Sequence, residues 1–199
     1  MRIAQTEVYP FAELSADAQK VAIEVEQQVQ SECFSFDTCD FKTICETVGV
    51  QNPEFSWTGF WSQGDGLSFT GEYSYATQAL AKIKAYAPQD TGLHDIVAEL
   101  QDLQKQHGYR LTATITRNHS CHYCHENSVI IQAFKAGEEV EIEQFENCFK
   151  ALMRHFYEMV QSEYESITGE EYSRECLTDS DNEYTADGKI WVQPLTARH

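Results

Sequence analysis

The densest group of side chains that could do chemistry is the run His119–His125, which reads His-Ser-Cys-His-Tyr-Cys-His. Five of its seven side chains are imidazoles or thiols, the groups that bind zinc and other soft transition metals in proteins. A zinc site would draw its ligands from His119, Cys121, Cys124 and His125. The run therefore supports the hypothesis of a metalloprotein, in which zinc either stabilises the fold or assists a hydrolysis.

The secondary structure that we expect around this run argues against the metal. Cys121–Phe134 is predicted to form the return strand of a β-hairpin whose turn is Asn118–Ser120. Successive side chains of a strand point to opposite faces, so Cys121 and Cys124 would not face the same ion. We therefore predict no cofactor, with zinc as the alternative. The motifs G-x-S-x-G, H-E-x-x-H and G-x-G-x-x-G are also absent, which favours a protein that is not an enzyme.

A second candidate is the stretch Gly59–Gly71, which reads GFWSQGDGLSFTG. Apolar and polar residues alternate on both sides of Gly-Asp-Gly, and the glycines supply the positive φ of a tight reversal, so the stretch predicts a β-hairpin. Its aromatic side chains would either pack into the core or form a recognition tip. In the second case Trp61, Gln63 and Asp65 are the residues expected to contact a partner.

Charge is the third feature. The chain has 199 residues with 14 basic and 32 acidic side chains, a net charge of −18, which opposes direct binding to nucleic acid or to an anionic membrane. The segment Gly137–Gly188 holds fifteen acidic and three basic residues, a net charge of −12. This segment is either a solvated surface that maintains solubility or a surface that docks onto the basic groove of another protein. The carboxylates expected to make such contacts are Glu138, Glu139, Glu141, Glu143, Glu163, Glu165, Glu170 and Glu171.

The elements that position these residues follow from the apolar periodicity. A first helix enters at Leu14–Ser15 and carries an apolar stripe of Ala18, Val21, Ala22, Val25 and Val29. Further helices are expected at residues 37–48, 76–86, 93–107, 140–167 and 168–177, and hairpins at 55–75, 111–134 and 183–192. Helices segregated from antiparallel hairpins indicate an α+β fold. We expect one domain over residues 1–199, with the two larger hairpins in one antiparallel sheet, helix pairs covering one face and a long C-terminal helix.

The sequence also bears on the compartment. The first fifteen residues lack the apolar segment of a signal peptide, and no run of 18 apolar residues occurs. Seven cysteines are an odd number at a density below that of disulfide-rich scaffolds, which favours reduced thiols. We therefore expect a cytoplasmic protein.

Four stretches carry a resemblance to a known family. They are Tyr9–Ala18 (Tyr-x-Phe-x-Glu-Leu-Ser-x-x-Ala), Gly59–Gly71, Tyr86–Asp90 (YAPQD) and Asn182–Gly188 (Asn-Glu-Tyr-Thr-x-Asp-Gly). In these stretches the chain resembles small acidic proteins encoded by bacteriophages, plasmids and integrated elements, most of them without assigned function and some described as antitoxin-like. The second hairpin of that family carries a Tyr-x-His segment, so the two cysteines of this chain depart from its pattern.

The resemblance implies a mobile-element protein in a bacterial host cell. Accessory proteins in that setting commonly block host defence, including CRISPR complexes, restriction enzymes and nucleases. Those targets have basic nucleic-acid grooves, which an acidic surface could occupy as a mimic of DNA. We therefore expect an inhibitor that binds such a host protein, of anti-CRISPR or anti-restriction type. The metalloprotein and an antitoxin that neutralises a cognate toxin are the alternatives.

Overall fold

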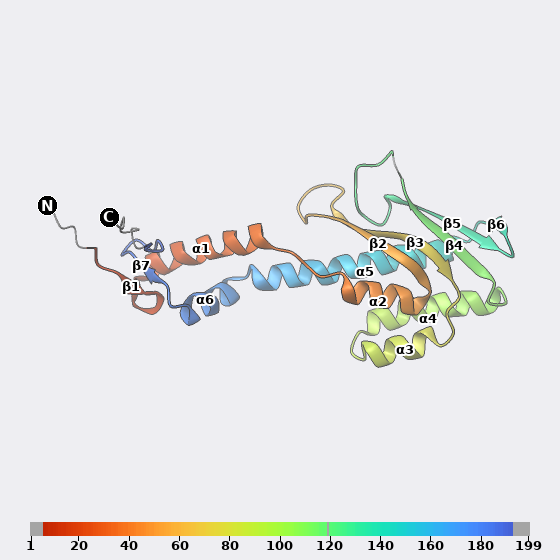
Figure 1. Ribbon diagram of the computed structural model, residues 1–199, viewed down its shortest axis with the longest axis horizontal. Helices are drawn as coiled ribbons and strands as arrows, with labels where there is room; N and C mark the ends of the chain where they lie inside the picture. Colours follow the sequence, from red (N-terminus) through yellow and green to blue (C-terminus); the bar gives the residue numbers. More distant parts are fainter. Residues whose placement is uncertain (1–5, 119, 193–199) are drawn as a thin grey trace, which may run out of the picture. The chain divides into compact units, whose positions relative to one another are not determined.

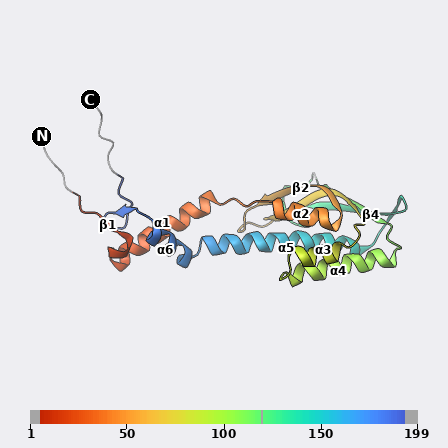
Figure 2. The same ribbon diagram turned by 60° about the horizontal axis from the view of Figure 1, so that its bottom comes forward.

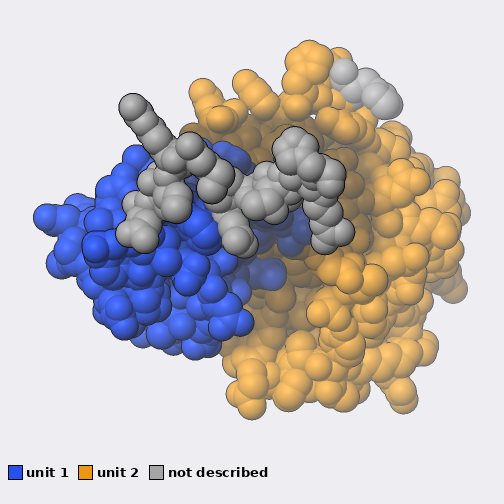
Figure 3. Space-filling view, turned by 60° about the vertical axis from the view of Figure 1, so that its left-hand side comes forward, with its two compact units in different colours: residues 1–35, 162–199 blue, residues 36–161 orange. Residues whose placement is uncertain are grey.

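A computed structural model describes residues 6–118 and 120–192 of the chain. Within these residues six α-helices and seven strands occupy 48% and 22% of the chain, and every paired strand is antiparallel, which confirms the α+β prediction. The residues form two compact units, coloured separately in Figure 3. Unit 1 comprises Met1–Ser35 and Ser162–His199, and unit 2 comprises Phe36–Gln161.

Unit 2 is built on a five-stranded sheet of order β2-β3-β4-β5-β6 (Figure 1). Its strands are β2 (Val50–Thr58), β3 (Gly66–Ser74), β4 (Leu111–Arg117), β5 (Val129–Lys135) and β6 (Glu138–Val140). The two expected hairpins are confirmed, β2 with β3 and β4 with β5, and the pairing of β3 with β4 joins them into one sheet. The fifth strand, β6, was not predicted from the sequence.

The helices of unit 2 lie on one face of this sheet (Figures 1 and 2). They are α2 (Cys39–Val48), α3 (Ala79–Tyr86), α4 (Thr91–Gln106) and α5 (Glu143–Ile167), the last of which continues into unit 1. Alternation along the strands separates the two faces: Leu111, Ala113 and Ile115 of β4 are buried, whereas Thr112 and Thr116 are exposed. One face of the sheet therefore carries the core and the other remains polar.

Aromatic side chains fill the layer between α5 and the sheet. The ring of Phe156 stacks on that of Phe41 from α2 at a centroid distance of 4.5 Å, and it contacts Phe55 of the first hairpin edge to face and Phe69 in a tilted arrangement. Nearer the start of α5, Phe149 packs against Tyr73 at 5.0 Å. These contacts bury the face of α5 that the spacing of its apolar residues predicted.

One buried polar residue completes this core. Gln104 of α4 is fully buried and its side chain pairs with both the N–H and the C=O of Leu111, at 3.2 and 2.7 Å. Its amide also donates to the hydroxyl of Tyr73. Because every one of these buried groups has a partner, the network fixes α4 against β4 instead of destabilising the core.

Three features of unit 2 differ from the sequence prediction. Strand β2 begins at Val50 because a bulge at Asn52 and Pro53 lets the strand continue past a proline. Residues 120–128 form a loop, not the start of a strand, and the pairing of β5 begins only at Val129. Ala136 and Gly137 turn the chain with positive φ, and β6 then pairs with β5. A strand of only three residues is rarely evident from the sequence.

Unit 1 has a small core of its own. Its elements are β1 (Tyr9–Pro10), a 3₁₀ turn η1 (Phe11–Glu13), α1 (Ala16–Cys33), the end of α5, α6 (Glu170–Asp179) and β7 (Glu183–Tyr184). Strands β1 and β7 pair across the ends of the chain, and β7 also bridges to Ile190, which partly realises the expected terminal hairpin. The buried residues are Phe11, Leu14, Ala18, Ala22, Ile23, Leu177 and Tyr184.

The start of α1 is confirmed, but only Ala18 and Ala22 of the expected stripe are buried. The Oγ of Ser15 accepts from the N–H of Ala18 as an N-cap, whereas Val21, Val25 and Val29 are 38%, 48% and 46% exposed. The short helix α6 buries a single large apolar side chain, Leu177, within unit 1. That core therefore covers one edge of α1, at its alanines, and leaves the valine stripe outside.

Asp90, at the start of α4, contacts both its own helix and α5, and this role can be tested by mutation. Asp90 caps the helix by accepting from the N–H of Leu93 at 2.9 Å, and its second oxygen lies 2.7 Å from Nε2 of His155 on α5. We expect Asp90→Ala to lower the free energy of unfolding by about 1–2 kcal/mol, because it removes the cap and the partner of a half-buried imidazole. Urea denaturation measures this loss. Asp95→Ala removes the same charge from an exposed position of α4 and should change stability by less than about 0.5 kcal/mol; equal stability of both variants would contradict the capping role.

Candidate functional site

The two regions that the sequence singled out for chemistry lie together in unit 2. The loop between β2 and β3 (residues 59–65) and the loop between β4 and β5 (residues 118–128) are neighbours at one end of the sheet, and we call them the paired loops (Figure 1). The N–H of Cys124 reaches the carbonyl of Gly64 at 3.4 Å, a direct link between them. The Gly-rich hairpin and the Cys/His run therefore form one structural feature.

Two glycines make this close approach possible. A Cβ on Gly66 would lie 2.6 Å from Cα and Cβ of His125, and a Cβ on Gly64 would overlap the ring of Tyr123. Gly64 also has a φ of +92°, a value that L side chains rarely adopt. The glycines of the Gly-Asp-Gly reversal are thus needed for contact with the second loop as well as for the turn itself.

Hydrogen bonds inside each loop hold its backbone. The carboxylate of Asp65 accepts from the N–H groups of Trp61 and Ser62 at 3.0 and 2.7 Å. In the other loop, Nδ1 of His125 accepts from the N–H of Asn127 at 3.0 Å, and the N–H of Asn118 donates to Ser128. Asp65, which the sequence predicted to contact a partner, is half-buried and acts inside its own loop.

Helix α5, which lies on the helical face of the sheet, contacts both of the paired loops. Arg154 donates to Glu126 of the second loop at 2.8 Å, and Tyr157 packs against Phe60 of the first at a centroid distance of 5.7 Å. Burial raises the pKa of Glu126, but the hydrogen bond from Arg154, a backbone hydrogen bond and the nearby positive charge together outweigh it, so the pKa lies below its ordinary value. Glu126 therefore stays ionised at neutral pH, and its charge is compensated within the loop region.

The surface of the paired loops is aromatic and polar. Trp61 is 76% exposed, Tyr123 is 47% exposed, and Gln63 and His122 are exposed beside them. Such a tip can contact a partner through the indole and phenol rings. The sequence prediction for Trp61 and Gln63 is compatible with where the structure places them.

The proposed zinc ligands do not converge within the described residues. No group of three His, Cys, Asp or Glu side chains there is arranged to hold a metal ion, and His119 lies outside the described residues. Cys124 is buried, with Sγ 3.7 Å from a guanidinium nitrogen of Arg117, and Cys121 is half-buried. The alternation argument against the metal was nevertheless wrong, because residues 120–128 are a loop and not a strand.

The carboxylates expected to meet a partner are divided between the units. Glu138 and Glu139 lie on β6, and Glu141 and Glu143 lie at the start of α5, all exposed and all in unit 2. Strand β6 pairs with the end of β5 that is remote from the paired loops, so this acidic group and the paired loops lie at opposite ends of the sheet (Figure 1). The other four, also exposed, belong to unit 1: Glu163, Glu165, Glu170 and Glu171.

Unit 1 concentrates the negative charge of the protein. Its described residues, 6–35 and 162–192, hold fifteen acidic and three basic side chains, a net charge of −12 over 61 residues. Unit 2 has seventeen acidic and nine basic side chains, a net charge of −8 over 126 residues. The described residues of unit 1 are therefore about three times as acidic per residue as unit 2, and Arg2 and Arg198, which lie outside the described residues, bring the net charge of the whole sequence to −18.

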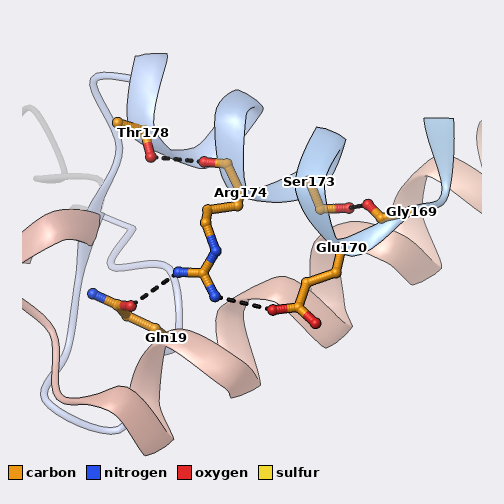
Figure 4. A network of polar contacts seen from close by, with 6 residues as sticks. All are labelled: Gln19, Gly169, Glu170, Ser173, Arg174 and Thr178. Atoms are coloured by element: carbon orange, nitrogen blue, oxygen red, sulfur yellow. Dashed lines mark hydrogen bonds and ion pairs between the residues drawn. The ribbon is translucent and has the colours of Figure 1, made fainter. Parts of the chain in front are cut away.

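Two of the three cations of unit 1 are held inside it. Arg174 bonds to Glu170 at 3.0 Å and to the amide oxygen of Gln19 at 3.2 Å, which ties α6 to α1 (Figure 4). Lys189 pairs with Asp187 at 2.7 Å. Hydrogen bonds from Lys189 and Thr185 lower the pKa of Asp187 to about 2. These cations fix the structure of unit 1 and offset little of its surface charge.

The sequence prediction missed the contribution of α1 to this acidic unit. Six of the fifteen acidic residues lie in residues 6–35, before the segment Gly137–Gly188 that composition alone selected. Four of them, Asp17, Glu24, Glu26 and Glu32, lie on α1, which also carries the exposed valine stripe. The signal was present as glutamates interleaved with valines, but it was taken for an ordinary amphipathic helix.

Comparisons with known proteins agree with this division of the chain. The sheet, its helices and the paired loops define an α+β protein built on a five-stranded antiparallel sheet. The chain belongs to the family described as Domain of unknown function (DUF8835), whose profile matches residues 34–170. The matched residues contain all of unit 2 and end at the first residue of α6. No curated protein and no solved structure matches the chain significantly.

Among the helices of residues 6–118 and 120–192, none combines the length and apolar character that crossing a bilayer requires.

The contact between the paired loops can be tested at Gly66. We expect Gly66→Ala to lower the free energy of unfolding by about 1–3 kcal/mol, because the methyl group meets the backbone of His125. Hydrogen exchange at the amide of Cys124 should accelerate as the second loop is displaced. Gly92→Ala is the matched control, since its Cβ would meet nothing closer than 3.5 Å. Unchanged exchange at Cys124 in Gly66→Ala would show that the loops do not depend on each other.

Proposed function

We propose that this protein is a non-enzymatic inhibitor encoded by a bacteriophage or another mobile element. It acts in the cytoplasm of the bacterial host. There it binds a nucleic-acid-handling defence protein, of anti-CRISPR or anti-restriction type, by placing carboxylates in the groove that would otherwise hold nucleic acid.

The observation that carries the proposal is the concentration of charge in unit 1. A net charge of −12 on 61 residues resembles the dense negative charge of a nucleic acid backbone, and two of the three cations there are engaged in ion pairs of unit 1. Electrostatic complementarity of this kind accelerates association and selects partners with basic surfaces. The carboxylates of unit 1 are therefore the expected contact residues.

The setting in the cell is supported by the resemblance in Tyr9–Ala18, Gly59–Gly71, Tyr86–Asp90 and Asn182–Gly188 to acidic mobile-element proteins. Defence proteins that handle nucleic acid present the basic grooves that such a surface would fit. The resemblance and the charge distribution are independent observations, and both favour the same class of partner.

Two variants with equal charge changes test the proposal. The first replaces Glu163, Glu165, Glu170 and Glu171 of unit 1 by Gln, and the second replaces Glu138, Glu139, Glu141 and Glu143 of unit 2 by Gln. Each set removes four charges; the unit 2 set includes one glutamate in the first turn of a helix, Glu143, and the unit 1 set includes two, Glu170 and Glu171. Thermal unfolding verifies that both variants fold.

The readout is the plating of a targeted phage on bacteria that carry a CRISPR or restriction system. The wild-type protein should raise the plating efficiency of the phage. The unit 1 variant should raise it at least about tenfold less than wild type, whereas the unit 2 variant should raise it as much as wild type. The complex recovered from these cells should also weaken at least about tenfold between ~50 and ~200 mM salt, because screening acts on charge-dominated association. Full protection by the unit 1 variant, or a complex indifferent to salt, would reject the proposal.

A further inference from the structure

Unit 1 contains an apolar groove beside the exposed valine stripe of α1. The groove has a volume of about 130 Å³ and is lined chiefly by Val25, Val29, Leu177, Tyr184 and Ile190. Apolar cavities of ~150 Å³ in proteins accept a molecule as large as benzene, so this groove has room for one large apolar side chain. Val25, Val29 and Ile190 on its walls are 46–48% exposed.

We propose that this groove and the valine stripe bind a basic amphipathic helix of the partner, with one apolar side chain of that helix in the groove. The inference rests on the proposed function and specifies the contact that unit 1 makes. Val21, Val25 and Val29 follow one another at intervals of four residues and form a continuous seam about 12 Å long. A seam of this spacing suits a helix that presents its own i, i+3, i+4 and i+7 anchors.

The charges around the seam decide the chemistry of the occupant. Glu24 and Glu32 lie three residues after Val21 and Val29 and so share their face of α1, and Glu26 is one of the groove residues. The partner helix should therefore flank its apolar residues with lysine or arginine. Long basic side chains can also lay their apolar stems along the valines while their charged ends reach the carboxylates.

The same charges disfavour the other occupants of an apolar seam. A second copy of this chain would bring two surfaces together that belong to units of net charge −12 each. An anionic membrane surface would be repelled for the same reason. A basic helix is the partner that gains from both the apolar and the acidic part of the surface.

An independent feature of the groove is Tyr184. Its side chain is fully buried, lines the groove and contacts Phe11, yet its hydroxyl has no hydrogen-bond partner among the described residues. Buried hydroxyl groups in native proteins are normally paired, because an unpaired one costs free energy. Because the hydroxyl is itself buried, an occupant of the groove would lie beside Tyr184 without reaching this group.

The test uses the full chain and a defined probe. The probe is a fluorescein-labelled peptide of about 18 residues, five helical turns, with leucines along one face and lysines elsewhere. A scrambled peptide of the same composition has the same charge without an apolar face. Binding is followed by fluorescence anisotropy at ~50 and ~200 mM salt.

Two variants isolate the groove from the charge. Val25→Ser with Val29→Ser makes the groove polar and leaves the net charge unchanged. Ile130→Ser is the matched control, because Ile130 on β5 is an exposed β-branched residue of unit 2 with 46% exposure. We expect the amphipathic peptide to bind more tightly than the scrambled one, the double variant to lose at least about tenfold in affinity and the control to stay within about twofold.

The outcomes separate this inference from the proposed function. If both peptides bind alike and the double variant binds as well as wild type, the groove assignment is overturned, while salt-sensitive binding still supports the acidic surface. If binding depends on the valines but not on salt, the acidic contribution fails and the basic character of the partner is rejected. If sedimentation shows a dimer that the double variant dissociates, the occupant is a second copy and the inference is wrong.

Discussion

The packing of the aromatic face of α5 against the inner face of the five-stranded sheet is the interaction on which the rest of the structure depends. Phe156, stacked on Phe41 and in contact with Phe55 and Phe69, joins α2, α5 and the first hairpin in one layer. The same helix reaches the paired loops through Arg154 and Tyr157. Because burial of apolar and aromatic surface is the main favourable term in folding, this layer determines which residues of unit 2 remain for contact with other molecules.

Unit 1 is constrained differently. Its core is small, and its buried residues on α1 are two alanines and one isoleucine, which suffices to hold α6 and β7 but covers little of the helix. The stripe of valines and most carboxylates are left on the surface as a consequence. A surface that combines exposed apolar side chains with dense negative charge is typical of a binding site, and it is complementary to a basic amphipathic partner. We attribute the binding function to this unit and a supporting, structural role to the sheet of unit 2.

Much of the fold could be predicted from the sequence because the local signals were strong. Ser15 as an N-cap and the Gly-Asp-Gly reversal each identify a boundary through a specific backbone requirement. What could not be predicted depends on tertiary contacts. Strand β6 exists because β5 offers an edge, the 120–128 loop is held by its neighbour at Gly64 and Gly66, and the orientation of α1 is set by what α6 can cover. The charge of residues 137–188 was evident from composition, but its division between two units was not.

Hydrogen–deuterium exchange of the protein bound to its partner tests the central claim most directly, since it reports which backbone segments the partner covers. The account predicts added protection in α1 (Ala16–Cys33) and α6 (Glu170–Asp179), with little change on β6 and in the paired loops. Protection confined to the paired loops, with the exchange of α1 and α6 unaltered, would contradict it and would assign recognition to the tip around Trp61.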